Sequence, residues 1–489
     1  MTVTASDIAS MTRCSHRVYL DRHGNPDDRV PYPDFLQILW ESGRLHEEGV
    51  VAALDISQPK GNDFDSLFKS SIELMTSGAP LIYQSVLKHD DMSGIPDILK
   101  KVDKPSRFGQ HSYVPVEIKF GMAWIDSKAN KLKPKPHYIA QLCAYAEILG
   151  GIQGFVPETA FVIDSSDTWV ELTLRDFWPE YERLRNSARD IDRKSLATMA
   201  GKKAACDQCA WFELCDQDIR KRDDVTLVSG IGESHREKLW HIGIRTVSHL
   251  VDADHDLLVT VKGIGKTSAT KWTRQARVQK SADAEIRERW IPPSAPYEVS
   301  YDIEDFFFSS TVYLHGLLIR RSTSRKFGDK DHSPDDFGQY EAICGEGNES
   351  EESIWHRFMS RVEEIDRLSD YIVYVYSHHE VTYLSKLRER HGSSAALERF
   401  MSRFVDLFEP VRNHFVFPTE STSLKSIASF CGFSWRDPDP GGSQSIAWWA
   451  NYLKDPVRNA PLRDRVIRYN EDDTRASLVI KDWMERMSR

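Results

Sequence analysis

The 489-residue sequence has no long apolar run and only seven cysteines. No stretch approaches the roughly 20 apolar residues that a membrane-spanning helix needs, and the first residues lack the basic and apolar regions of a secretory signal. We therefore expect a soluble, cytoplasmic protein without membrane partners. Seven is an odd number and cytoplasmic thiols stay reduced, so metal or cluster ligation explains the cysteines better than disulfides do.

The sequence also lacks an excess of positive charge. Its 64 Lys and Arg residues against 74 Asp and Glu residues give a formal net charge of -10, so no overall field attracts nucleic acid. Nucleic acid is not excluded as a ligand, because phosphate-cleaving sites are built from carboxylates and local basic patches can supply binding. The hydrophobic content of 40% suffices for packed cores, and the length predicts two or three domains.

Changes of pattern divide the chain into three segments. Residues 1–222 mix helices and strands, residues 223–285 read as a compact helical unit, and residues 295–489 begin with strands and end in helices. We expect helices over 6–21, 35–54, 137–150 and 476–487, with Ser6 as the first N-cap, and strands over 81–87, 94–102, 113–120, 298–308, 311–320 and 371–377. The predicted fold class is α/β multidomain.

Four cysteines predict a clasp between the two ends of the first segment: Cys14, Cys206, Cys209 and Cys215. Four thiolates can hold an iron–sulfur cluster or a tetrahedral zinc ion, and both alternatives stay open. Zinc ribbons usually show two CxxC pairs, so the CxxC-x5-C spacing favours the cluster. The other cysteines have no partners in spacing and are predicted to be core or free thiols.

Between the clasp halves lie residues that suit a hard metal ion. Asp97 follows Pro96, and Glu117 and Lys119 stand two apart on the next predicted strand, so they share a face. Two carboxylates can hold Mg²⁺ or Mn²⁺, and a lysine can orient water or stabilise developing charge. Gln141 and Tyr145 lie one helical turn apart on the following helix. Alone, each motif is common.

Together with His46 on an early helix and the four cysteines, these residues resemble the RecB-like PD-(D/E)XK nucleases that carry an iron–sulfur cluster, such as the CRISPR-adaptation exonucleases. The resemblance implies a restriction-endonuclease-like fold over residues 1–222 and a [4Fe-4S] cluster on the four cysteines, with Zn²⁺ as the alternative. It also implies that His46, Asp97 and Glu117 bind metal, that Lys119 is catalytic, and that Gln141 and Tyr145 line the DNA path.

The middle segment contains an internal repeat of Gly-Ile-Gly, at Gly230 and Gly232 and again at Gly263 and Gly265, followed by Lys266. It resembles a tandem helix-hairpin-helix domain, whose backbone amides bind DNA phosphates without reading sequence. The segment GIGKTS is not part of a Walker loop (G-x-x-x-x-G-K-[ST]), because Thr260 occupies the position of the first glycine. A spacer or protein-docking unit is the alternative.

The third segment carries a second carboxylate set. Asp302 and Glu304 share one face of a predicted strand, and Tyr469 and Asp473 lie one turn apart on a late helix. This resembles the DnaQ-like and YprB-like exonucleases of DEDDy type, which implies a ribonuclease H-like fold, two metal ions, and a tyrosine that orients water. Glu380 stands where that family has aspartate, and Asp406 is a possible substitute. A fold that binds nucleic acid but cleaves poorly is the alternative.

The order of the three parts resembles a bacterial family of RecB-like nucleases. It implies an Mg²⁺- or Mn²⁺-dependent DNA nuclease, an exonuclease on single-stranded or end-containing DNA, in repair, recombination or defence. One alternative is an accessory nucleic-acid-binding subunit of a helicase–nuclease complex, whose helicase another chain would supply. The other is an RNA-processing 3′–5′ exonuclease led by residues 295–489.

Overall fold

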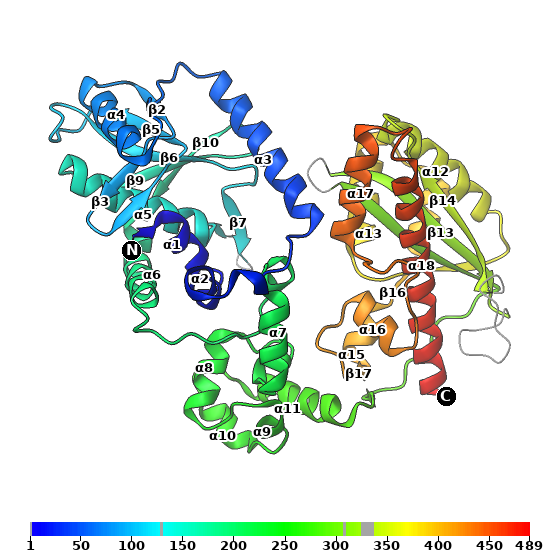
Figure 1. Cartoon of the computed structure of the whole chain (residues 1–489). Helices are drawn as coiled ribbons and strands as arrows, with labels where there is room; N and C mark the ends of the chain where they lie inside the picture. The colour runs from blue at the N-terminus through cyan, green and yellow to red at the C-terminus, as the bar shows by residue number, and fades with distance from the viewer. Residues whose placement is uncertain (1, 128–130, 307–309, 324–336) are drawn as a thin grey trace. The chain divides into compact units, whose positions relative to one another are not determined.

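The computed structural model describes residues 2–127, 131–306, 310–323 and 337–489, and the chain forms two compact units, Met1–Asp218 and Ile219–Arg489 (Figure 1). Each unit contains its own five-stranded sheet and its own hydrophobic core. Among the described residues, no helix combines the length and the apolar character that a membrane crossing requires. The predicted metal-binding residues of residues 1–222 and 295–489 therefore lie in different units.

The first unit is built on a sheet with the strand order β10-β9-β6-β5-β2. Its central strand β6 (Ser112–Ile118) is buried along its length, as its apolar sequence requires, and α5 (Pro136–Gln153) packs against it. The other strands of this sheet are β2 (Leu81–Tyr83), β5 (Ile98–Val102), β9 (Thr159–Ile163) and β10 (Trp169–Thr173). Around it lie β7 (Trp124–Ser127), β8 (Lys131–Pro134), α3 (Asp34–Ala52), α4 (Phe64–Ser77), α6 (Trp178–Asp192) and α7 (Phe212–Lys221).

The strand expected over 81–87 is instead two strands in different sheets. Strand β2 ends at Tyr83, Gln84 adopts a positive φ of 49°, and β3 (Leu87–His89) joins a sheet with β4 (Met92–Gly94) and β1 (Val3–Thr4). A left-handed backbone at a non-glycine residue interrupts an extended strand. The Gln84 amide donates to the Asp97 carbonyl at 2.9 Å, so this turn lies beside a predicted site residue.

The helix expected over 6–21 is two helices, and Ser6 is not the cap. Helix α1 (Ala5–Met11) is capped by Thr4, whose hydroxyl accepts a hydrogen bond from the Asp7 amide at 3.1 Å. Helix α2 (Ser15–His23) has Cys14 as its N-cap, and the Cys14 sulfur accepts from the Arg17 amide at 3.4 Å. The break therefore places the Cys14 thiol at the start of a helix.

The second unit begins with two helical hairpins. They comprise α8 (Glu233–His241), α9 (Val247–Val251), α10 (His255–Thr260) and α11 (Lys266–Ser281), which pack around their own core. Gly230 and Gly263 adopt φ values of 91° and 94°, which L side chains rarely adopt. Gly232 and Gly265 are the N-caps of α8 and α11. The repeated glycines thus mark two equivalent hairpin turns, each leading into a helix.

The rest of this unit is a sheet with the order β14-β13-β12-β15-β16 and helices on both faces (Figure 1). Its strands are β12 (Tyr297–Phe306), β13 (Thr311–Arg321), β14 (Gln339–Cys344), β15 (Tyr371–Val375) and β16 (Phe404–Asp406), with a small pair β11 (Glu285–Ile286) and β17 (Phe415–Val416). Its helices are α12 (Glu351–Ile365), α13 (His379–His391), α14 (Ala395–Ser402), α15 (Phe408–Asn413), α16 (Leu424–Phe430), α17 (Gly442–Lys454) and α18 (Ala460–Ser488). Residues 307 and 308 of the strand expected over 298–308 lie outside the described residues.

Alternation along β12 divides its side chains between the two faces. Tyr301 and Ile303 pack into the core that α12, α13 and α14 cover, whereas Asp302 and Glu304 face α18. A buried ion-pair network holds α18 to the sheet, because Arg320 on β13 contacts Asp482 at 2.6 Å and Lys481 contacts Glu298 at 2.6 Å. Losing one partner would leave buried charge uncompensated, so this network specifies the position of α18.

Candidate active sites

Three carboxylates of the second unit converge. Asp302 and Glu304 project from β12, and Asp473 projects from α18 toward them, so that one oxygen of each lies within 4.8 Å of the others. Among the described residues, no other group of three His, Cys, Asp or Glu side chains is gathered this closely. Oxygen ligands at this spacing suit a divalent cation such as Mg²⁺ or Mn²⁺.

Neutral donors orient these carboxylates. The Asn470 amide donates to Asp302 at 2.6 Å and more weakly to Glu304 at 3.4 Å. The Ser445 hydroxyl donates to Glu304 at 2.6 Å, and the Trp435 indole donates to Asp473 at 2.7 Å. Donors of this kind orient the carboxylate oxygens without supplying positive charge.

Burial and mutual repulsion raise the pKa values of these three carboxyls. Burial, reinforced by Asp473 and Glu304, raises the pKa of Asp302 well above its usual range. Burial also raises the pKa of Glu304 to about 8 and that of Asp473 to about 6. Buried carboxylates that repel one another hold protons unless a cation replaces them.

Glu380 supplies a fourth carboxylate. It lies in the first turn of α13, is 4% exposed, and has one buried oxygen without a partner in the described part of the chain. Burial raises its pKa to about 7, and its charge contributes to the raised pKa of Asp302. Asp406 instead accepts hydrogen bonds from the amides of Ser377 and Phe408, so its observed contacts orient the turn before α13.

Tyr469 and Lys425 border the same cluster. Tyr469 is buried, and its interaction with Asp473 counteracts part of the rise in the pKa of that carboxyl. The Lys425 ammonium lies 5.2 Å from the centre of the Tyr469 ring, and the neighbouring carboxylates Asp473 and Glu304 only partly offset the burial that lowers its pKa. The sequence had signalled Tyr469 by its spacing from Asp473. Lys425, Asn470, Ser445 and Trp435 were missed, because no local pattern marks them.

In the first unit, Asp97, Glu117 and Lys119 are neighbours. Asp97 lies just before β5 and accepts a hydrogen bond from the Ile118 amide at 2.7 Å, and Lys119 forms an ion pair with Glu117. Burial, followed by the Glu117 charge, raises the pKa of Asp97 well above its usual range. Burial lowers the pKa of Lys119, but Glu117 and Asp97 outweigh this and raise it above its ordinary value.

His46 projects from α3 and is nearly buried, with a side chain 11% exposed. Its Nε2 and the Oε1 of Glu117 are buried polar atoms without hydrogen-bond partners in the part of the chain that the structure describes. A bound ion or an ordered water is one way in which such atoms are satisfied. His46, Asp97 and Glu117 nevertheless do not converge within 4.8 Å as the acids of the second unit do.

Gln141 and Tyr145 form a hydrogen-bonded chain on α5. The Gln141 amide donates to the Tyr145 hydroxyl at 2.9 Å, which donates to the Ile95 carbonyl at 3.0 Å. Tyr145 is 2% exposed, so its observed contacts orient Gln141 and do not present its ring to solvent.

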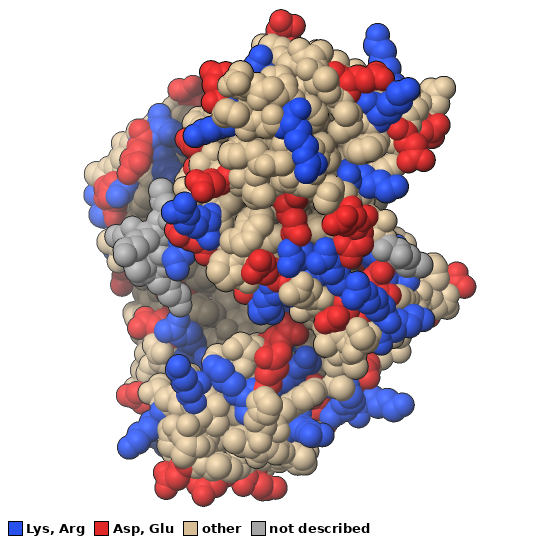
Figure 2. Space-filling view, turned by 90° about the vertical axis from the view of Figure 1, so that its left-hand side faces the viewer, with Lys and Arg blue, Asp and Glu red and all other residues tan. Residues whose placement is uncertain are grey.

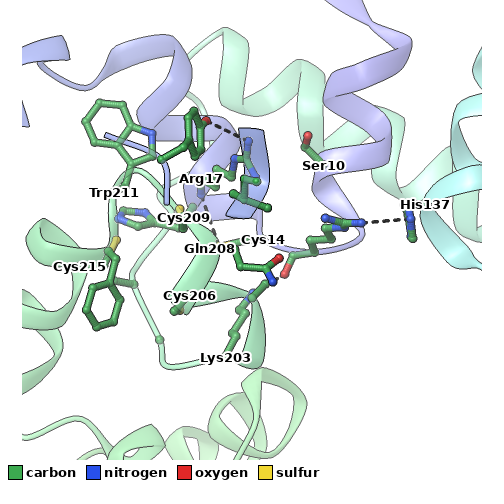
Figure 3. A pocket seen from close by; sticks show the side chains of 18 of the residues that line it. Ser10, Cys14, Arg17, His137, Lys203, Cys206, Gln208, Cys209, Trp211 and Cys215 are labelled. Atoms are coloured by element: carbon green, nitrogen blue, oxygen red, sulfur yellow. Dashed lines mark hydrogen bonds between the residues drawn. The ribbon is translucent and has the colours of Figure 1, made fainter. Parts of the chain in front are cut away.

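The four predicted cysteine ligands line one pocket of about 260 Å³ (Figure 3). Cys14 comes from the turn between α1 and α2, and Cys206, Cys209 and Cys215 come from the segment leading into and through the first turn of α7. Burial raises the pKa of Cys215 to about 12, with smaller contributions from the other three thiols. The structure therefore brings the two ends of the clasp together.

A short connection links the cysteine pocket to the Lys119 site. Arg13, which precedes Cys14, hydrogen-bonds His137 at 3.0 Å, and the next residue, Tyr138, has its ring centre 5.8 Å from the Lys119 ammonium. Both contacts start from α5. The start of α5 therefore lies between the cysteine pocket and Lys119.

At the hairpins, Lys266 opens α11 directly after the Gly265 cap and is exposed. Basic and acidic side chains are interspersed on the face that Figure 2 presents, in keeping with the net charge of -10. Any attraction of nucleic acid must therefore be local.

Comparison with family models finds two matches. Residues 300–485 match the RNase H superfamily, and residues 223–277 match the SAM-like helix-hairpin-helix tandem. No match is found among curated proteins. The chain thus contains an RNase H-superfamily domain and a tandem helix-hairpin-helix domain, which indicates a nuclease acting on nucleic acid, and the acidic triad fits the divalent metals that such nucleases use. Neither match reaches Met1–Asp218, whose PD-(D/E)XK identity stays a prediction.

Gly316→Ala should weaken metal binding without changing any ligand. Gly316 pairs with Asp302 across β12 and β13, and a Cβ there would overlap the Asn470 side chain. Displacing the Asn470 amide removes the donor that orients Asp302, so we expect Mn²⁺ affinity, measured by calorimetry, to fall roughly 10- to 100-fold. Gly442→Ala is the matched control, because its Cβ would meet open space. Equal affinities in the two variants would contradict this role of Asn470.

Metal binding at the acid cluster should release protons. Burial raises the pKa of Glu304 to about 8 and that of Glu380 to about 7, so both are largely protonated near pH 6, whereas a cation binds the ionised forms. We expect Mn²⁺ affinity to rise roughly tenfold or more between about pH 6 and pH 8. With chelator present, unfolding temperature should fall over this range, because the folded state binds the proton more tightly than the unfolded state. A Glu304→Gln variant that kept the full pH dependence would refute the assignment.

Proposed function

We propose that the chain is a metal-dependent nuclease whose second unit hydrolyses phosphodiester bonds at Asp302, Glu304, Glu380 and Asp473. The observation that carries this proposal is the convergence of buried carboxylates with raised pKa values. Bound Mg²⁺ or Mn²⁺ would polarise the phosphate and activate water. Tyr469, which interacts with Asp473, would orient that water, and Lys425 would offset negative charge beside it.

We also propose a second nuclease site in the first unit, of the PD-(D/E)XK kind. The orphaned His46 Nε2 and Glu117 Oε1 support it, since both atoms could ligate a metal with Asp97. Lys119 would stabilise charge on the phosphate once the cation draws Glu117 away from it. The proposed substrate is single-stranded or end-containing DNA, held by the hairpin amides and Lys266, in repair, recombination or defence. A helicase from another chain is the proposed partner.

The clasp is proposed to hold a [4Fe-4S] cluster. A zinc ion bound at about 2.3 Å would bring its four sulfurs to about 3.8 Å from one another. All four cysteines are described, and no three of their sulfurs lie within 4.8 Å of each other. A pocket of about 260 Å³ with separated thiols suits a cluster, whose cysteines ligate separate iron atoms.

The proposed function predicts which substitutions abolish cleavage. Asp302→Asn should reduce Mn²⁺-dependent cleavage of end-labelled DNA or RNA at the second-unit site by at least about 100-fold, because it removes a ligand charge. Lys119→Ala should do the same for the first site, and the double variant should be inactive. Exposed Glu352→Gln and Lys104→Ala are controls.

The pattern over substrates distinguishes the alternatives. Loss of RNA cleavage only in Asp302→Asn, with DNA untouched by the wild type, would establish the RNA-processing alternative. A wild type that binds but cleaves neither nucleic acid would refute the nuclease proposal and favour an accessory subunit.

Anaerobically purified protein should be brown and contain about four iron and four sulfide per chain. Cys209→Ser should lose most of the iron, whereas Cys431→Ala, a buried thiol outside the clasp, should keep it. A colourless protein with one zinc per chain would establish the alternative metal.

A further inference from the structure

A cleft of about 530 Å³ lies within the second unit, between α11 and the segment from α15 to the loop before α16. Its α11 wall carries Lys266, Lys271 and Arg274, and its other wall carries Arg287 and Arg412. The remaining polar lining includes the hydroxyls of Ser229, Thr267, Thr270, Thr419, Ser421 and Thr422. Arg287 and Arg412 belong to neither hairpin, so the cleft extends beyond the helix-hairpin-helix motif onto the sheet domain.

The charge of the cleft has a single sign. No acidic side chain lines it, although Asp and Glu outnumber Lys and Arg in the chain. Arg274 pairs with Glu285 at 3.2 Å. Within the described residues, no ion-pair partner is found for the other four lining cations, which are Lys266, Lys271, Arg287 and Arg412. Unpaired cations and hydroxyls on facing walls fit a polyanion.

The cleft offers phosphate contacts and no surface for reading bases. Phe415 and Phe417 belong to its lining, but both rings are buried against Trp483. Bases therefore find no exposed aromatic platform here, and binding would follow the backbone without sequence preference.

The two walls are fastened together. The Gln275 amide on α11 donates to the carbonyls of Phe417 and Thr419 at 2.8 and 3.1 Å, and β11 pairs with β17 beside them. These contacts thus join the hairpin domain and the sheet domain at the cleft.

The cleft wall continues to the acid cluster. The loop that supplies Ser421 and Thr422 leads directly into α16, and the Tyr376 hydroxyl holds its Thr422 carbonyl at 2.8 Å. Lys425, in the first turn of α16, faces Asp473 and Glu304. This loop and the first turn of α16 therefore connect the lining of the cleft to the acid cluster.

We propose that this cleft binds the phosphate backbone of one nucleic-acid strand and delivers it to the site at Asp302 and Asp473. The proposal rests on the proposed function of that site and adds its substrate path. Arg287 and Arg412 are the residues through which the sheet domain holds the strand beyond the hairpins.

The test compares Arg287→Gln/Arg412→Gln with the matched control Arg277→Gln/Arg289→Gln, whose arginines are exposed but outside the lining. Binding of fluorescein-labelled oligothymidylate to the full chain is measured by anisotropy in Ca²⁺ over a range of NaCl. Two lost contacts should weaken binding roughly 25-fold at about 0.1 M salt and reduce the slope of log K against log salt by about 1.4. Oligouridylate and a duplex, measured in parallel, distinguish DNA from RNA and one strand from two.

Hydrolysis of the p-nitrophenyl ester of thymidine 5′-monophosphate with Mn²⁺ reports the metal site separately, because this ester is too short to span the cleft. We expect the cleft variant to hydrolyse it as the wild type does. An unchanged salt slope, or equal weakening by the control, would overturn the cleft proposal. Absent ester hydrolysis with the expected change of slope would overturn the proposed function and support the cleft.

Discussion

Mutual repulsion among buried carboxylates is the constraint on which the second unit depends. Asp302, Glu304, Glu380 and Asp473 are brought together where burial penalises each negative charge. The hydrogen bonds from Asn470, Ser445 and Trp435 orient the oxygens but leave the charge in place. A divalent cation that bound there would displace protons from these carboxyls, and this makes the cluster a candidate for chemistry.

The surrounding fold supplies the rigidity that such a cluster needs. The buried network around Arg320 and Asp482 ties α18 to the sheet and thereby positions Asp473. Ser377, with a φ of 117°, adopts a backbone conformation that side chains disfavour, and the Asp406 carboxylate holds its amide. This strained turn precedes α13 directly and places Glu380 in the site. The ion-pair network and the Ser377 turn thus hold Asp473 and Glu380 close to the other carboxylates, although their negative charges repel one another.

The first unit also buries carboxylates close together, but there a lysine offsets part of their negative charge. Lys119 neutralises Glu117 directly, while the Nε2 of His46 remains without a partner among the described residues. The cysteine pocket joins the two ends of this unit, and Arg13 and His137 connect it to the neighbourhood of Lys119. A cofactor at the clasp would then act on the site through position, with no need to take part in the reaction.

The sequence by itself determined the features that depend on local geometry. Period-two alternation places Asp302 with Glu304, and Glu117 with Lys119, on one face, and one helical turn separates Tyr469 from Asp473. The repeated glycines marked the hairpins, because few other residues adopt their φ values. Even local signals failed where two caps or conformations competed, as at Thr4 and Gln84.

Tertiary structure alone decided which distant groups meet. The Asn470 bond to Asp302 joins residues 168 positions apart, and the Ser445 bond to Glu304 joins residues 141 positions apart. The cationic cleft likewise combines α11 with a loop some 150 residues later, from single basic residues that no spacing distinguishes. Such contacts arise from the packing of α17 and α18 on the sheet and of α11 on the segment around β17. Periodicity describes one element at a time, so it carries no information about them.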